Sequence, residues 1–388
     1  MSRKWITSWL AAWLVGFLAV LPAPAQNLRD MQIFGPADVS TYGGGIGSNE
    51  GYFFVFDGLI WSISSPDATT IGRQSDVGRV VWYGPDESQT ATHNNSHTTG
   101  FLQAEFVGGQ RIEFGCVTEH SGWLVSTYWL QDQTQCIQAP GLIVLWEDRE
   151  WGGPQDYKHL QGYVDSGQTQ IENLPVVFDD AVICNQVDTW SVELMYTYRL
   201  HPLRYGGNFE LFAGVRYMEF NEQFNVEATG GLLDASSWYT RADNHIVGPQ
   251  VGARWSKKRG RWTLSAEGRF FAGYNNQNIR QNGELGTNLT PPGGTGELLA
   301  MGPSPFNHRR YFDEFSPGAE LRVEAKWQWT KAISFGAGWT GFYLDGIARP
   351  SNMINYELAE QHTMGITDTN HQQDVFVNGL QIHVDVNR

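Results

Sequence analysis

The feature that most constrains this chain is an alternation of apolar and polar residues in recurring segments, from Gly51 to the C-terminus. The run LRVEAKWQW, from Leu321 to Trp329, is an example: its odd-numbered residues are apolar and its even-numbered residues are charged or polar. Because successive side chains of a strand point to opposite faces, such a segment has one oily face and one charged face. Repeated around a closed sheet, the pattern predicts a transmembrane β-barrel with lipid outside and a polar lumen inside.

About ten strands are expected from this pattern, near residues 51–63, 109–120, 122–132, 188–200, 208–220, 245–257, 261–273, 316–328, 331–344 and 374–386. Short turns and long segments alternate between them, and the long segments are 64–108, 133–187, 221–244, 274–315 and 345–373. Outer-membrane barrels have short periplasmic turns and long external loops, and an even strand number leaves both termini in the periplasm. The predicted fold is therefore all-β: a single antiparallel up-and-down transmembrane β-barrel of 10–12 strands, with its long loops at one end.

The N-terminus has the pattern of a secretory signal. Arg3 and Lys4 supply the positive charges, an apolar stretch follows, and Ala23-Pro24-Ala25 is a small-residue cleavage site. A transmembrane anchor is the alternative, but the cleavage site follows directly and no basic stop-transfer cluster is present. We expect a signal peptide at 1–25, a periplasmic leader at 26–50 and the barrel at 51–388, located in the outer membrane.

Composition narrows the function further. The net charge is −15, and removal of the two positive charges of the signal makes it −17. Such an acidic chain is a poor candidate for nucleic-acid binding, which calls for a basic patch. The mean hydropathy of −0.35 is compatible with a barrel, because a barrel strand presents lipid-facing side chains only at every second residue. The 44 glycines and 16 tryptophans suit tight turns and interfacial aromatic girdles.

The polar faces of the strands predict the residues that line the lumen. Charges of both signs are expected to point inward, namely Glu193, Arg199, Glu210, Arg216, Glu267, Arg269, Glu320, Arg322, Glu324 and Lys326. Side chains fill a barrel of about eight strands, whereas wide aqueous pores need about sixteen. We therefore expect Glu and Arg to pair across the lumen, because a lone charge there is costly. A narrow or gated channel for small solutes is the alternative interpretation.

Tryptophans beside the predicted short turns indicate a periplasmic aromatic girdle, formed by Trp123, Trp255, Trp262, Trp327 and Trp329. Three others, Trp61, Trp129 and Trp190, are placed to contribute to an outer girdle.

Two cysteines flank the long segment between the third and fourth strands. Because those strand ends are neighbours, we predict a disulfide between Cys136 and Cys184, with two free thiols as the alternative. Closing a loop of about 49 residues would contribute roughly 4 kcal/mol in the chain-entropy model. Cys116 lies within a strand and is interpreted as a small apolar filler.

Several segments combine glycines and aromatic residues at strand spacing: 109–130, 210–222, 244–255, 263–283 and 325–350. In these segments the chain resembles the outer-membrane β-barrel porin family that is abundant in planctomycete bacteria. The resemblance covers roughly residues 50–388 and implies a barrel fold, outer-membrane residence and a pore function, with no catalytic residues. One departure is the C-terminus, Val386-Asn387-Arg388, since many such barrels end in an aromatic residue that helps insertion.

Catalysis and metal binding are not favoured. Histidines and acids occur in the external segments, His93 and His97 among them, but the chain has no G-x-S-x-G and no H-E-x-x-H motif. We expect no catalytic residue, no metal and no cofactor. The expected partners are outer-membrane lipid and the barrel-insertion machinery, with no nucleic acid. Four functions remain: a porin-like barrel that passes small solutes, a non-conducting structural or surface-interaction barrel, a barrel hydrolase, and a secreted soluble β-protein.

Overall fold

The computed structural model describes residues 51–72, 80–82, 89–91, 97–118, 120–147, 162–164, 173–200, 207–230, 234–287, 304–358 and 364–387. The predicted signal peptide and leader, together with His93, lie outside these residues. Within them, no helix combines the length and the apolar character needed to cross a membrane.

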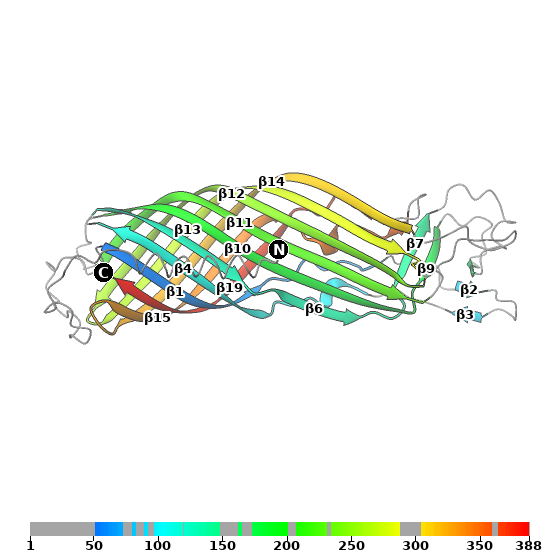
Figure 1. Cartoon of the computed structure of the whole chain (residues 1–388), viewed down its shortest axis with the longest axis horizontal. Coiled ribbons are helices and arrows are strands. Elements are labelled where there is room, and N and C mark those ends of the chain that lie inside the picture. Colours follow the sequence, from blue (N-terminus) through cyan, green and yellow to red (C-terminus); the bar gives the residue numbers. More distant parts are fainter. Residues whose placement is uncertain are drawn as a thin grey trace, which may run out of the picture.

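Ten antiparallel strands form a closed barrel (Figure 1). They are β1 (Gly51–Ile63), β4 (Phe106–Val117), β5 (Ser121–Leu130), β10 (Asp180–Arg199), β11 (Gly207–Thr229), β12 (Ser236–Arg259), β13 (Trp262–Leu285), β14 (Ser304–Gln328), β15 (Ile333–Ile347) and β19 (Gln373–Asn387). Each pairs with the next in this order, and β19 pairs back with β1, Phe53 opposite Asn387. The predicted closed barrel is confirmed, with its short turns at one end and long connections at the other. The expected long segment 221–244 was wrong, because β11 and β12 extend into it and are joined by residues 230–235 alone.

The five strands β10–β14 are 20 to 25 residues long, roughly twice the length that a tilted strand needs to span a bilayer. The expected outer ends of these strands, near residues 188, 220, 245, 273 and 316, were therefore wrong. Beside the extended part of β10 runs β6 (Gln133–Gln138), which continues the course of β5 after a short break.

The remaining described elements are short. They are β2 (Val80–Trp82), β3 (Gln89–Ala91) and β8 (Gly162–Val164) in one sheet, β7 (Ile143–Glu147), β9 (Asn173–Val177) and β17 (Glu357–Leu358) in another, the pair β16 (Ile354–Asn355) and β18 (Gly365–Ile366), and the 3-10 helices η2 (Thr99–Phe101) and η4 (Pro350–Asn352). Strands β2 and β3 lie in the long connection after β1 but do not join the barrel wall.

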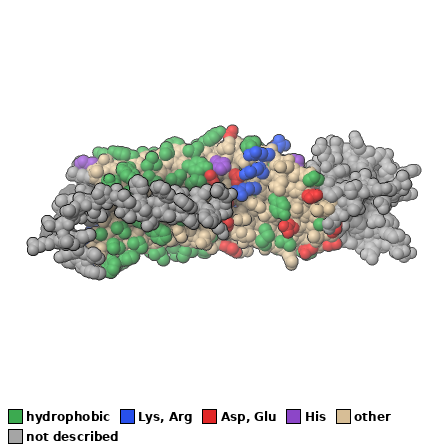
Figure 2. Space-filling model, in the orientation of Figure 1, with side chains coloured by type: hydrophobic (Ala, Val, Ile, Leu, Met, Phe, Trp, Pro, Cys, Tyr) green, Lys and Arg blue, Asp and Glu red, His purple; other side chains and the backbone are tan. Residues whose placement is uncertain are grey.

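The long strands change character along their length. On the outer face of β13, Trp262, Phe270 and Tyr274 are exposed, whereas beyond Tyr274 that face carries Asn276, Arg280 and Asn282. Facing residues of four strands mark the change: Tyr217, Val247, Tyr274 and Phe315. We call the part between the short turns and this row the lower barrel, and the part beyond it the upper barrel. Figure 2 shows apolar side chains gathered over the lower barrel and few over the upper barrel.

The apolar outer face has the height of a membrane. From Trp262 to Tyr274 the chain advances by 12 residues, and at about 3.3 Å per residue with a tilt of about 40° this covers roughly 30 Å along the barrel axis. That distance matches the hydrocarbon thickness of a bilayer.

Candidate functional site in the barrel lumen

A ladder of alternating charge lines the lower lumen. Five facing positions on β10–β14 carry Arg199, Glu210, Arg254, Glu267 and Arg322. Arg199 Nε lies 2.7 Å from Glu210 Oε1, and Arg254 contacts the carboxylates of both Glu210 (3.6 Å) and Glu267 (2.5 Å). Because the side-chain period of a strand is two, the five residues share the inner face, and opposite charges on neighbouring strands attract each other there.

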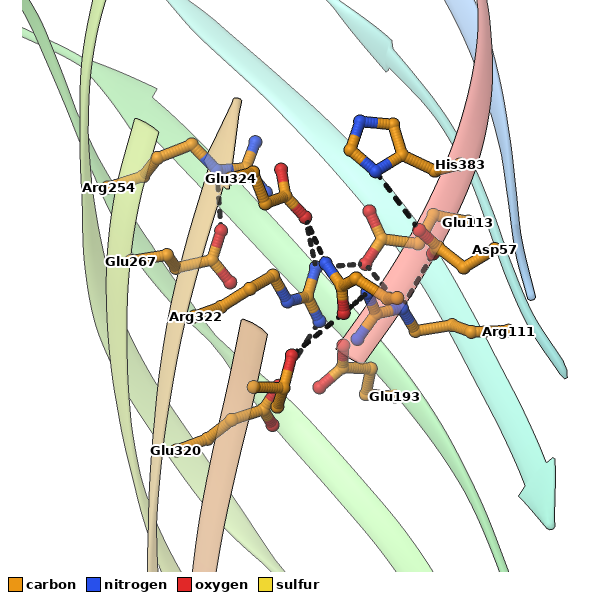
Figure 3. A network of polar contacts seen from close by, with 12 residues as sticks. Asp57, Arg111, Glu113, Glu193, Arg254, Glu267, Glu320, Arg322, Glu324 and His383 are labelled. Carbon is orange, nitrogen blue, oxygen red and sulfur yellow. Dashed lines mark hydrogen bonds and ion pairs between the residues drawn. The ribbon is translucent and has the colours of Figure 1, made fainter. Parts of the chain in front are cut away.

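Toward the centre of the lumen the pairs become a network (Figure 3). Arg322 donates to Glu113 (2.7 Å) and to Glu320 (3.1 Å), and Arg216 donates to the other oxygen of Glu320 (2.8 Å). Arg269 pairs with Glu193 and with Glu267. All of these side chains are buried. Each charge therefore has partners of opposite sign, which is the condition for keeping ions inside a protein.

A second branch of the network joins β1, β4 and β19. Arg111 Nε donates to Asp57 (2.8 Å), and Gln381 accepts from Arg111 (2.8 Å) and donates to Glu324 (2.7 Å). Nearer the short turns, Lys326 Nζ lies 3.3 Å from Asp385.

Asp57, Glu324 and His383 have ligand atoms within 4.8 Å of one another, close enough to share a cation. The charge around them argues against that use. Arg111 already pairs with Asp57, and Lys326 Nζ lies 3.6 Å from Glu324. A cation would have to enter beside two positive side chains, so this trio fits the ionic network better than a metal centre.

Little space remains in this network. A cavity lined by Arg111, Ser126, Tyr128, Ser191, Glu193, Arg216, Glu320 and Arg322 has a volume of about 10 Å³. That is enough for roughly one water molecule.

Above the network, the connection that follows β15 enters the lumen. Arg349 is buried and donates two hydrogen bonds to Glu222, of 2.6 and 3.1 Å, and one of 2.7 Å to the carbonyl of Ser64. Asn244 holds the backbone of Ala348 through both its amide nitrogen and its oxygen. Gly346 makes the turn into the lumen at a φ of +70°, which favours glycine. We call residues 346–358 and 364–372 the plug.

The middle of the plug is part of an apolar core inside the upper barrel. Ile354, Tyr356 and Met364 pack with Phe224 and Trp238, and this core also contains Ile71, Ala139, Leu142, Val144, Phe178, Ala181, Ile183, Val226, Ala228, Leu285 and Phe306. The rings of Trp238 and Tyr356 lie 6.4 Å apart. Burial raises the pKa of Tyr356 above its ordinary value.

The structure places all ten residues expected in the lumen on the inner face, buried or partly buried. It adds charged residues that the sequence argument did not name, namely Asp57, Arg111, Glu113, Arg254 and His383. A signal for two of them existed, because Arg111 and Glu113 alternate with Ile112 and Phe114 in the same way as the predicted residues.

The five tryptophans of the expected periplasmic girdle lie on the outer face near the short turns, with Trp123, Trp262 and Trp329 exposed and Trp255 and Trp327 partly exposed. The expectation for Trp61 was wrong. Its side chain is 2% exposed and lies inside the barrel, against Arg111 and Tyr128. The reason is the parity of β1: Trp61 shares its face with Asp57, which also points inward.

Cys136 and Cys184 form a disulfide between facing positions of β6 and β10, and Cys116 is a free thiol. The pair therefore joins two strands of the upper barrel wall, outside the part that faces lipid.

One histidine pairs closely with an acid. His371 Nε2 lies 2.8 Å from Glu314 Oε1, and the imidazole stacks on Phe312 at 4.3 Å. Among the described residues, no serine or threonine hydroxyl forms a hydrogen bond with His371. A nucleophile aligned with a base, which acyl transfer by a serine enzyme requires, is therefore not formed at this pair.

A closed ten-strand barrel with an apolar belt, a polar lumen and its long connections at one end defines the class of outer-membrane β-barrels. The chain belongs to the family described as "Putative beta barrel porin-7 (BBP7)", whose sequence model matches residues 185–387, or 203 of the 388 residues. It is thus a porin-like barrel of the outer membrane. The planctomycete origin implied by the resemblance stays a prediction.

No curated protein matches the chain. Among solved structures, it is similar to the outer membrane protease OmpT from Escherichia coli, with 8% identity, 88% of this chain and 97% of the other covered, and a TM-score of 0.42. It is also similar to a mutant of the monoaromatic hydrocarbon channel TodX of P. putida (5% identity, 87% and 91% covered, TM-score 0.22) and to a FadL homologue of Pseudomonas aeruginosa (7%, 87% and 89%, 0.19). At these TM-scores the likeness carries no argument about function.

Proposed function

We propose that this protein is a non-conducting outer-membrane barrel with a closed lumen, which acts as a structural or surface-interaction element of the cell envelope. The observation that carries the proposal is the filling of the lumen at three successive heights. The ionic network fills the lower lumen, Arg349 and Glu222 fill the middle, and the apolar core around Trp238 fills the upper barrel.

The upper barrel supplies the surface for interaction. It extends β10–β14 beyond the lipid-facing belt, and its outer face is polar. Because short turns face the periplasm in outer-membrane barrels, this surface would project from the cell. The signal peptide at 1–25 and the partners expected from the sequence, outer-membrane lipid and the barrel-insertion machinery, belong to the same proposal.

A second candidate is a gated channel for small solutes, and the family description as a porin favours it. In this candidate the plug is the gate. A side chain that is held mainly by one carboxylate, as Arg349 is by Glu222, can be released by a single change. Passage would also require the lower network to open, because its cavity holds only about one water molecule.

Reconstitution of the purified full-length protein in planar bilayers tests both candidates. A closed lumen predicts no conductance steps for the wild-type protein. The variant Arg349→Ala should also be silent, because the ionic network below the plug stays in place.

Regular conductance steps from the wild-type protein would contradict the closed-lumen proposal. Steps that appear only in Arg349→Ala would favour the gated channel instead. Arg259→Ala is the matched control, because Arg259 is exposed at the short-turn end of β12, far from the plug.

A further inference from the structure

Three arginines lie side by side on the outer face of the upper barrel. Arg241 faces Arg280 across β12 and β13, and Arg280 faces Arg309 across β13 and β14. All three side chains reach solvent, with Arg280 48% and Arg241 37% exposed. Figure 2 shows basic side chains gathered in a stripe just beyond the apolar belt. We call these residues the arginine row.

If it served the fold alone, the arginine row would lower the stability of the upper barrel. Like charges at directly facing positions of neighbouring strands repel each other, and here two such contacts are adjacent. A single carboxylate, that of Asp243, accepts hydrogen bonds from both Arg241 and Arg280. Within the row and its direct contacts, three positive charges stand against one negative charge, and the next acids on the membrane side of this outer face, Glu219 and Asp313, lie two rows nearer the apolar belt. In a chain whose net charge is −15, this local excess points to an anionic ligand.

The position of the arginine row indicates which anion is in reach. Along β12, Arg241 lies six residues beyond Val247 of the last apolar row, or roughly 15 Å along the barrel axis at a tilt of about 40°.

The guanidinium groups reach back toward the membrane. Arg241 and Arg280 bond to Asp243, Arg309 donates to Asn278 (2.9 Å), and Arg309 lies over the ring of Tyr311 at 4.6 Å. Asp243, Asn278 and Tyr311 form the next facing row toward the apolar belt, so the charged heads lie within roughly 10 Å of that belt, near the headgroup level.

We propose that the arginine row binds the phosphate groups of a lipid headgroup in the outer leaflet of the membrane. Arginine presents a planar fork of donors that matches phosphate oxygens, and three adjacent forks suit a headgroup that carries more than one phosphate. Asp243 keeps two of the forks in place when no phosphate is bound. The lipid anchors the upper barrel at a fixed height above the membrane on the β12–β14 side.

Binding of lipid A, a glycolipid with two phosphates, to the purified full-length protein in zwitterionic detergent tests this proposal. Each arginine near a membrane surface contributes about fivefold to binding. Arg280→Gln should therefore weaken lipid A binding roughly fivefold, and the triple variant Arg241→Gln, Arg280→Gln, Arg309→Gln on the order of a hundredfold. Circular dichroism verifies that each variant is folded, and Arg280→Gln remains informative if the triple variant is not.

The matched control removes three positive charges from the opposite end of the same strand: Lys257→Gln, Lys258→Gln, Arg259→Gln, at exposed positions of β12. Its affinity for lipid A should stay within about twofold of wild type, because these residues lie more than a Debye length from the row. Equal losses in the control and the triple variant, or unchanged affinity in the triple variant, would overturn the proposal. Displacement of lipid A by inorganic phosphate at equal concentration would also overturn it, since the site would then take free phosphate.

Discussion

The lower and upper barrels are built from the same five strands, but their outer faces and their interiors differ in composition. In the lower part of β13, Glu267 and Arg269 point inward and Phe270 points outward. In the upper part of the same strand, Ile279 and Leu285 point inward together with the buried amides of Asn275, Gln277 and Gln281, and Asn282 points outward. The backbone pairing continues through the change without a break on β13 and β14.

The change on the outer face shows that the surroundings, and not the strand itself, decide whether that face is apolar. Lipid around the lower barrel removes the hydrophobic gain of an apolar interior, since the outside is equally apolar. The lower interior is instead dominated by ion pairs and hydrogen bonds, beside a small apolar cluster of Leu124, Met195 and Phe212. Water around the upper barrel restores the hydrophobic drive, and the interior there is the apolar core around Trp238.

The largest loss in the free energy of unfolding is expected from a substitution in the ionic network of the lower barrel. Arg322→Met removes the partner of Glu113 and Glu320 while keeping an apolar side chain of moderate size. Loss of one partner from a buried ionic group costs about 3–5 kcal/mol. Two carboxylates each lose a partner here, while Glu320 keeps Arg216 and Glu113 keeps Arg111, so the expected loss lies within that range. Denaturant unfolding of the protein in lipid vesicles measures it.

The matched control for this variant is Arg310→Met on the same strand. Arg310 and its partner Asp368 are both exposed, so the free energy of unfolding should change by less than about 0.5 kcal/mol. If both variants lose the same stability, the ionic network does not hold the lower barrel together.

A smaller and more local loss of stability is expected from a cavity in the apolar core of the upper barrel. Trp238 is fully buried and packs against Phe178 and Tyr356. Trp238→Ala should cost about 3–4 kcal/mol through the cavity it leaves. Hydrogen exchange should rise in the upper parts of β11–β13 and stay slow in the lower parts, since the ionic interior is untouched. Uniform acceleration along the strands would mean that the two parts unfold as one unit.

The lower barrel could be predicted from the sequence because apolar-out and polar-in alternation is the pattern expected of a strand in lipid. Arg322, Glu324 and Lys326 were assigned to the lumen from parity alone. The same argument failed for Trp61, since an aromatic residue near the membrane boundary fits the outer girdle and the interior equally well. The upper barrel does not follow from the same pattern, because residues 275–282 of β13 are polar on both faces except Ile279. Such a segment resembles loop sequence when a lipid-facing strand is sought.

The plug and the arginine row depend on register, which one strand alone does not reveal. Glu222 meets Arg349 across 127 residues, and nothing local to either residue indicates the other. The three arginines become neighbours only when β12, β13 and β14 are aligned. The disulfide was easier to anticipate, because Cys136 and Cys184 flank one long segment between strands that are adjacent in order.

The smallest expected loss of stability comes from placing an arginine at either of two positions on the outer face of β13, one in the lower barrel and one in the upper barrel. This pair of variants also compares the two outer faces most directly. Phe270→Arg places a charge on the lipid-facing surface and should cost about 2–3 kcal/mol, as measured for arginine near the bilayer midplane. Asn282→Arg, 12 residues further along the same outer face, should change the free energy of unfolding by less than about 0.5 kcal/mol, because water already surrounds it. Unfolding in vesicles gives both values. Equal costs would place both positions in the same solvent, and the boundary at the row of Tyr274 would then be wrong.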